Sequence, residues 1–192
     1  SNVFALRIDG TFDDCQDLVK LAFKKRDFLN NDQYLLAVNS INWARLMPQI
    51  VYYFSASLRL GGPDRKVSFS VPTGNFGDIY AGYLAKKMGL PIDQLIVATN
   101  KNDILHRFIA NNDYSVSELA KTHSPSMDIL VSSNFERFLF DVFDREGAAV
   151  ADLMAKFGKE LRSVSDAHWQ RVSAIFDSAA IDDETTCAVI AS

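Results

Sequence analysis

The sequence contains few of the residues that build covalently or metal-stabilised folds. Only two of its 192 residues are cysteine and only three are histidine. Cys15 and Cys187 are too few for a disulfide framework, and no second cysteine or histidine lies near either one at metal-ligand spacing. We therefore expect no metal site in this chain and a fold held together by its core.

Long apolar runs and a strong charge of one sign are also lacking. No run reaches the roughly 20 apolar residues of a membrane-spanning helix, and no basic leader opens the chain. The formal net charge of -4 argues against nucleic acid or an anionic membrane as the main partner. With so little cysteine, these features predict a cytoplasmic protein.

The middle of the sequence alternates between strand and helix patterns. Residues 67–71 and 95–98 are short apolar runs typical of buried strands. Residues 78–88, which end before Gly89, and residues 103–110 have helical patterns. This alternation predicts parallel βαβ units, and hence an α/β fold with helices on both faces of a parallel sheet.

The region before this unit predicts one strand and two helices. Residues 3–8 are rich in β-formers, and Thr11, with Asp14 three positions on, is a typical N-cap. Ser40 is placed to cap a long helix, in which Pro48 predicts a kink or a late start.

After Tyr114 the sequence first becomes polar and then helical. Ser133 and Glu136 have the spacing of a capping box before a Phe-rich helix. Residues 148–161 and 166–176 predict two more helices. We therefore divide the chain into an α/β segment, residues 1–115, and a mainly helical continuation, residues 116–192.

The loop between the first central strand and its helix is a candidate anion site. Gly74 and Gly77 allow positive φ and a close backbone approach. Successive N–H groups at a helix start form a natural phosphate site. The loop lacks the Gly-Lys-Ser/Thr of a P-loop and the third glycine of a dinucleotide fingerprint. From these residues alone, a simple connecting turn is an equally good interpretation.

The residues of several short segments resemble those of one enzyme family. Val-Pro-Thr-Gly-Asn-Phe-Gly-Asp at residues 71–78 is similar to the phosphate-binding loop of threonine synthases, which are β-family (fold type II) pyridoxal-phosphate enzymes. Asn-Ser-Ile-Asn at residues 39–42 is similar to another of their motifs. Residues 8–16, 98–103 and 132–137 agree in order and spacing, so the resemblance covers essentially the whole chain.

The resemblance implies a reaction, a cofactor and a set of site residues. Threonine synthases are carbon–oxygen lyases that convert O-phospho-L-homoserine and water into L-threonine and phosphate, with pyridoxal 5'-phosphate as the electron sink. The backbone N–H groups of the loop would hold the cofactor phosphate, and other polar residues would line or brace the site. Arg45 could pair with an anionic group, although a solvated helix residue is the favoured interpretation. The loop residues are Gly74, Asn75, Phe76 and Gly77, and the lining residues are Asn39, Ser40, Asn42 and Arg45.

No catalytic residue is expected in this chain. The family's Schiff-base lysine lies upstream of the matching segment, in a Thr-Leu-Ala-Phe-Lys-Asp context. Leu-Ala-Phe-Lys at residues 21–24 echoes that context, but Lys24 ends an amphipathic helix and is expected to be solvated. We therefore expect an internal piece of a threonine synthase that is inactive alone.

Other polar residues have simpler explanations than catalysis. The three histidines, His106, His123 and His168, are isolated in the sequence, and Asp182 to Glu184 is typical of a helix start. The chain begins and ends abruptly, so apolar surfaces could be exposed and drive self-association. Two alternatives stay open: another β-family pyridoxal-phosphate enzyme, or a non-catalytic phosphate-ligand or interaction domain on the same scaffold.

Overall fold

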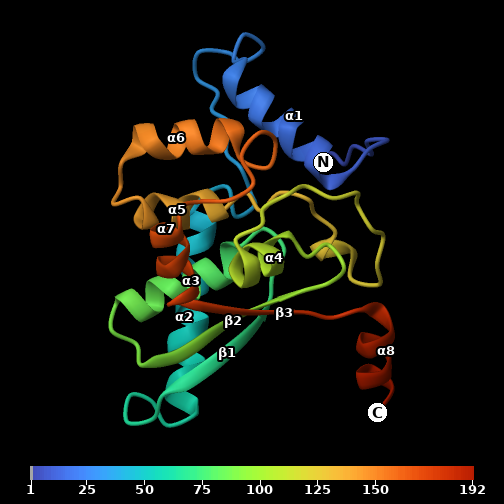
Figure 1. The fold of residues 1–192 in the computed structure, drawn as a ribbon. Coiled ribbons are helices and arrows are strands. Elements are labelled where there is room, and N and C mark those ends of the chain that lie inside the picture. Colours follow the sequence, from blue (N-terminus) through green and yellow to red (C-terminus); the bar gives the residue numbers. More distant parts are fainter. Residues whose placement is uncertain (1) are drawn as a thin grey trace.

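A computed structural model describes residues 2–192 as helices around a small parallel sheet (Figure 1). The first half contains α1 (Phe12–Lys24), α2 (Trp43–Arg59), β1 (Val67–Pro72), α3 (Gly77–Lys87), β2 (Ile92–Thr99) and α4 (Ile104–Asn111). The second half contains the short 3-10 helix η1 (Pro125–Met127), α5 (Phe135–Val142), α6 (Gly147–Lys156), α7 (Asp166–Ser173), β3 (Phe176–Ala180) and α8 (Asp183–Ala191).

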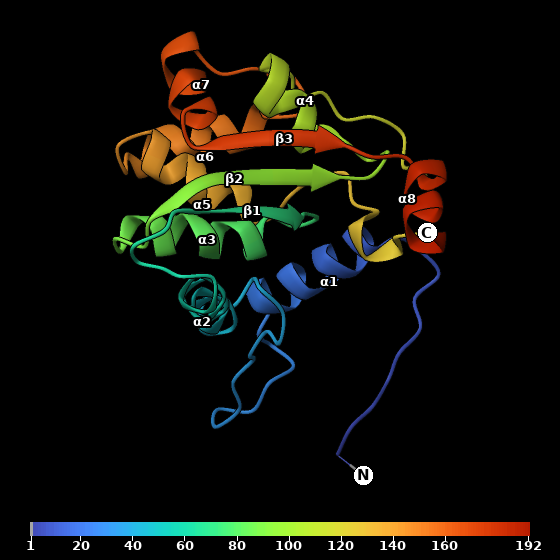
Figure 2. The ribbon, with the colours of Figure 1, turned by 90° about the horizontal axis from the view of Figure 1, so that it is seen from below.

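The sheet has the order β1-β2-β3, and both pairings are parallel. Figure 2 shows the three strands side by side with their carboxyl ends pointing the same way. The expected α/β fold with βαβ units is therefore confirmed, with β1, α3 and β2 as the first unit. The central position of β2 buries Leu95 and Val97 completely, so the chain supplies its own cover for this strand.

The strand β3 was not predicted from the sequence. The expected helix over residues 166–176 ends at Ser173, and Phe176–Ala180 continues as the third strand. Its residues Phe-Asp-Ser-Ala-Ala contain one aromatic and no β-branched side chain, so local propensity gives only a weak strand signal. Pairing with the open edge of β2 decides its conformation.

Helix α3 packs closely against α2 and β2. A Cβ atom on Gly82 would lie 2.6 Å from Cε1 of Tyr53 and 3.0 Å from Cδ2 of Leu95. Only glycine allows this approach without displacing an aromatic ring. The packing holds the first turn of α3, and with it the loop that precedes α3, against the sheet.

The core is rich in aromatic rings from distant parts of the sequence. Phe76, Phe108, Phe135 and Phe138 are fully buried and meet mostly edge to face, at centroid distances of 5.0 to 6.2 Å where they touch each other or neighbouring rings. Such pairs add about 0.5–1.5 kcal/mol each beyond simple area burial. The core therefore joins the glycine loop to α4 and α5.

The N-terminal expectations are partly wrong. Residues 3–8 form no strand, and the side chains of Phe4 and Leu6 are 86% and 90% exposed. An apolar run becomes a strand only by pairing, and β1, β2 and β3 are the members of the sheet. By contrast, Thr11 and Asp14 do form a capping box at the start of α1.

Two other helix starts differ from the expected ones. Asn42, rather than Ser40, caps α2, and Pro48 lies within that helix. Asn134, rather than Ser133, precedes α5, and in the described part of the chain its side chain makes no capping hydrogen bond. None of the helices within residues 2–192 combines the length and hydrophobicity needed to cross a membrane.

Candidate functional site: the glycine loop before helix α3

The glycine loop lies at the carboxyl edge of the sheet. It connects the end of β1 to the first residue of α3, Gly77. The amide of Thr73 donates to the carbonyl of Ala98 at 2.8 Å, which ties the start of the loop to the end of β2. In open parallel sheets this edge is the usual position of ligand sites.

The backbone of the loop turns at Phe76 rather than at a glycine. Phe76 has φ of 68°, whereas neither Gly74 nor Gly77 adopts positive φ. The expectation that the two glycines supply this geometry is therefore wrong. The left-handed conformation is unfavourable for phenylalanine. It is held because the Phe76 ring is fully buried, 5.1 Å from Phe135 and 5.2 Å from Phe176.

Gly77 is required by packing. A Cβ atom there would lie 3.0 Å from Cβ of Ser40 and 3.1 Å from both Nδ2 of Asn134 and Oδ1 of Asn75. The amide of Gly77 donates to Oδ1 of Asn75 at 3.0 Å. The small residue thus lets three polar side chains converge at the start of α3.

Two hydrogen bonds fix the direction of the loop peptides. The hydroxyl of Ser132 donates to the carbonyl of Gly74 at 2.6 Å, and the amide of Asn134 donates to the carbonyl of Asn75 at 3.0 Å. In a planar trans peptide the N–H points opposite to the C=O. The amides of Asn75 and Phe76 are therefore aimed away from the segment that holds these carbonyls.

The resulting loop leaves three backbone donors unpaired within residues 2–192. Among the described residues, the amides of Gly74, Asn75 and Phe76 have no hydrogen-bond acceptor. They lie directly before α3, a helix of 11 residues whose N-terminal end carries partial positive charge. Three unpaired donors at a helix start are a natural site for a phosphate monoester.

Ser40 joins the Asn-Ser-Ile-Asn segment to the loop. Its Oγ accepts from Nδ2 of Asn75 at 2.8 Å and from Nδ2 of Asn134 at 3.1 Å. Residue 40 is thus placed within the same polar cluster as Gly77.

The other proposed lining residues make only local bonds. Oδ1 of Asn39 accepts from the amide of Ile41, and Oδ1 of Asn42 accepts from the amide of Ala44. Arg45 is exposed on α2, and within residues 2–192 its side chain has no hydrogen-bond or ion-pair partner. The structure therefore brings Ser40 to the loop and gives Asn39 and Asn42 the role of shaping the turn before α2.

Burial raises the pKa of Asp78, the second residue of α3. Hydrogen bonds from the amides of Ile79 and of Asp78 itself oppose this effect only in part. The raised pKa reflects the buried position of this side chain at the start of α3.

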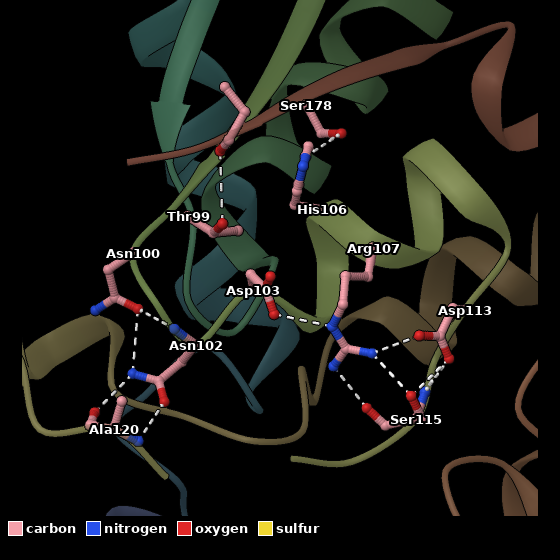
Figure 3. A network of polar contacts seen from close by, with 11 residues as sticks. Thr99, Asn100, Asn102, Asp103, His106, Arg107, Asp113, Ser115, Ala120 and Ser178 are labelled. Atoms are coloured by element: carbon pink, nitrogen blue, oxygen red, sulfur yellow. Dashed lines mark hydrogen bonds and ion pairs between the residues drawn. The ribbon is translucent and has the colours of Figure 1, made fainter. Parts of the chain in front are cut away.

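No role was predicted from the sequence for the residues that donate hydrogen bonds to the loop carbonyls. Ser132 and Asn134 are each 1% exposed, and both lie in a stretch that resembled the family without a role being evident. Asn100 and Asn102, which follow β2, are also buried and form a second polar cluster with Ala120 (Figure 3). The sequence signal for this cluster was the presence of polar residues directly after a central strand. That signal does not identify their partners in the later segment, which are 18 or more residues away.

The remaining titratable residues lie in other surroundings. Each histidine ring contacts one side chain: His106 contacts Ser178, His123 contacts Cys187, and His168 contacts Ser165. Lys24 is the exposed last residue of α1. The described residues contain no group of three or more His, Cys, Asp or Glu side chains able to hold a metal ion.

Comparison with known proteins gives consistent results. No protein-family model matches the sequence. The chain is 58% identical over 191 residues to the threonine synthase of Pseudomonas aeruginosa, a match that covers 99% of this chain and 40% of that protein. Comparable matches to curated threonine synthases cover 37% and 39% of those proteins, so the chain spans about two fifths of their length.

The fold agrees with solved threonine synthases. A crystal structure of the Brucella melitensis enzyme with pyridoxal phosphate bound superposes with a TM-score of 0.87 and 53% identity, covering 99% of this chain and 41% of that one. The yeast enzyme gives a TM-score of 0.80 and 43% identity, covering 94% of this chain and 38% of that one. The expected fold type II architecture is therefore confirmed. By sequence and by fold, this chain is a homologue of threonine synthases over about two fifths of their length.

Proposed function

We propose that this chain is the phosphate-holding part of a pyridoxal-phosphate-dependent threonine synthase. The whole enzyme would be a carbon–oxygen lyase that forms L-threonine and phosphate from O-phospho-L-homoserine and water, in the cytoplasm. The observation that carries this proposal is that the amides of Gly74, Asn75 and Phe76 have no acceptor within residues 2–192, in a chain so similar to threonine synthases.

The amides of Gly74, Asn75 and Phe76 would hold the phosphate ester of the cofactor. When bound, pyridoxal phosphate supplies an electron-withdrawing ring that makes substrate C–H bonds acidic. The N-terminal end of α3 would add a favourable potential at the phosphate.

Gly77 and Ser40 would keep the cradle in shape without contacting the reacting atoms. Gly77 leaves room for Ser40, and Ser40 fixes Asn75, whose own Oδ1 holds the Gly77 amide. Asn39 and Asn42 would brace the turn that carries Ser40. The exposed guanidinium of Arg45 would be free to pair with an anionic group such as the substrate phosphate.

The lysine that bonds covalently to the cofactor would come from another part of a longer polypeptide. Within this chain Lys24 is the residue whose context resembles that lysine, and it lies exposed at the end of α1. A covalent-catalysis lysine needs a desolvated or otherwise depressed amine. This chain alone would therefore hold the phosphate end of the cofactor and make no threonine.

The test uses a polypeptide of the relatives' full length that contains this segment. We expect it to release phosphate from O-phospho-L-homoserine and to form threonine only with pyridoxal phosphate present. Asn75→Ala should weaken cofactor binding, measured by fluorescence titration. Binding of pyridoxal phosphate without any threonine formation would instead support the non-catalytic alternative, and release of a different product would support another β-family enzyme.

A further inference from the structure

A long segment without regular strands passes from α4 to α5 beside the phosphate cradle. We call residues 113–134 the crossing segment; η1 is its short helical part. Its backbone lies directly against the loop, because a Cβ atom on Gly74 would be 3.3 Å from the carbonyl oxygen of Ser126 and 3.5 Å from Cα of Met127. Its position therefore decides the position of the loop.

Polar clusters fix the crossing segment near its beginning and its middle. Arg107 of α4 binds Asp113 at 2.7 Å and the carbonyl of Ser115 at 2.6 Å (Figure 3). Further along, Asn102 exchanges two hydrogen bonds of 2.9 Å with the backbone of Ala120. The two anchoring side chains, Arg107 and Asn102, both follow β2 in the chain. They therefore fix the crossing segment relative to the sheet.

The third anchor is Asp128, and it is the one nearest the loop. Oδ1 of Asp128 accepts from Nδ2 of Asn100 at 2.9 Å, from Nδ2 of Asn102 at 3.0 Å and from the hydroxyl of Thr122 at 2.7 Å. Oδ2 accepts from the amide of Thr122 at 3.0 Å. Asn100 and Asn102 are 5% and 6% exposed, so water does not readily replace these partners.

A short run of chain connects Asp128 to the loop. Next to it, Ile129 is 4% exposed, and its Cδ1 would lie 3.7 Å from a Cβ on Gly74. Four residues after Asp128, Ser132 donates to the carbonyl of Gly74, and Asn134 then donates to that of Asn75. These are the two bonds that aim the amides of Asn75 and Phe76.

We propose that Asp128 is a positioning residue for the phosphate cradle. Its carboxylate locks the crossing segment to the end of β2, so that Ser132 and Asn134 hold the loop carbonyls and its amides converge on a phosphate. The inference rests on the proposed function, since it assumes that the loop binds a phosphate ester. Within residues 2–192 Asp128 itself makes no hydrogen bond to the loop, so it would act through the crossing segment.

Aspartate is suited to this position because a carboxylate only accepts hydrogen bonds. Four donors converge on the two oxygens of Asp128. In Asp128→Asn one oxygen becomes an NH2 group, which accepts no hydrogen bond, so at least one of these four bonds is lost. The substitution keeps the size of the side chain, so a change in phosphate binding reports the lost acceptor.

The experiment titrates the isotope-labelled chain with inorganic phosphate at constant ionic strength and follows backbone amide shifts by NMR. In the unsubstituted chain the amides of Gly74, Asn75 and Phe76 should shift and saturate. Asp128→Asn should weaken the fitted phosphate affinity at least about tenfold, the order of one buried hydrogen bond to a charged group. Asp128→Glu, which keeps the acceptor, should recover part of that affinity.

Two further variants separate positioning from general damage. Asp113→Asn removes an acceptor of the same kind from the other end of the crossing segment, and it should leave phosphate affinity unchanged within about twofold. Ser132→Ala keeps the Asp128 network but removes the bond to Gly74, and it should lower phosphate affinity as Asp128→Asn does. If Asp128→Asn does not fold, the result with Ser132→Ala decides whether the crossing segment aims the loop.

The outcomes distinguish this inference from the proposed function. Equal phosphate affinity in Asp128→Asn, Ser132→Ala and the unsubstituted chain would overturn the positioning role and leave the proposed function standing. An unsubstituted chain whose loop amides do not respond to phosphate would overturn the cradle, and both proposals with it. An equal loss of affinity in Asp113→Asn would show that any weakening of the segment suffices, which also contradicts a specific role for Asp128.

Discussion

The side-chain amide of Asn75 donates a hydrogen bond of 2.8 Å to the hydroxyl of Ser40, 35 residues earlier in the chain. This bond joins the two motifs that most resemble threonine synthases. Asn134 donates to the same hydroxyl from a third segment. Three stretches that are separate in the sequence are thus held together by one oxygen atom.

Removing that oxygen should destabilise the chain. In Ser40→Ala the amide groups of Asn75 and Asn134 lose their acceptor, and Asn134 is 1% exposed. A buried donor left unsatisfied costs about 1–3 kcal/mol of unfolding free energy. Chemical denaturation measures the loss. Ser126→Ala is the control, because residue 126 is exposed and its side chain has no hydrogen-bond partner within residues 2–192; equal stability of the two variants would contradict the role of Ser40.

A side chain at residue 77 should disrupt the cradle. In Gly77→Ala the new methyl group lies 3.0 Å from Ser40 and 3.1 Å from Asn134 and Asn75, so the polar cluster must move apart. Overpacking of this kind costs about 1–3 kcal/mol, and phosphate binding by the loop amides should weaken with it. Thermal unfolding and phosphate titration measure the two effects.

The matched control for that variant is Gly147→Ala. Gly147 is the first residue of α6, and a Cβ there meets only Phe140 at 3.9 Å. We expect an unchanged or slightly higher unfolding free energy, because alanine has fewer backbone conformations than glycine in the unfolded chain. A Gly77→Ala variant that matches it in stability would show that Gly77 is not tightly packed.

The buried carboxyl of Asp78 should make stability depend on pH. Its pKa is raised by burial, so the folded chain binds this proton more tightly than the unfolded chain. Such a group favours the folded state at low pH, and this contribution is lost as the pH rises through the folded-state pKa. Asp78→Asn should therefore raise the unfolding free energy at pH 7, and the gain should shrink as the pH falls toward about 4, the usual carboxyl range. Denaturation curves at both pH values measure it, and a gain that grows on acidification would contradict the sign.

The outer face of α2 should drive self-association. Met47, Val51 and Leu58 are spaced along one stripe of this helix and are 46%, 62% and 58% exposed. Several exposed apolar side chains on one face of a helix are typical of an interface. Sedimentation at increasing protein concentration should show a dimer or larger species. Val51→Lys should shift the chain toward the monomer, because burying an unpaired charge opposes association; a compact monomer at all concentrations would refute this prediction.

Much of the fold could be predicted from local patterns. The segments 67–71, 78–88, 95–98 and 103–110 match β1, α3, β2 and α4 to within a few residues. The strands among these are short apolar runs, and the helices have apolar residues at helical spacing. Gly89, with φ of 101°, follows the end of α3 as expected. The resemblance to threonine synthases also pointed to residues 39–42 and 71–78, which the structure brings together through Ser40 and Asn75.

The prediction failed where a residue's role depends on distant partners. Residues 3–8 have a strand pattern but form no strand, whereas Phe176–Ala180 has no such pattern and forms one. Ser40 and Ser133 were both expected as helix caps, but Asn42 and Asn134 hold those positions. Strand pairing and competition between neighbouring polar side chains are tertiary effects that a local window does not contain.

The sequence by itself determined the resemblance to threonine synthases, the α/β class and the position of the glycine loop, because each follows from contiguous residues. Only the tertiary structure decided how the loop is aimed. The left-handed turn falls on Phe76 because its ring is locked among Phe135 and Phe176, and the loop carbonyls are held by Ser132 and Asn134. The direction of a backbone N–H is set by what binds the carbonyl on the other side of its peptide plane, and here those partners come from segments about 60 residues away.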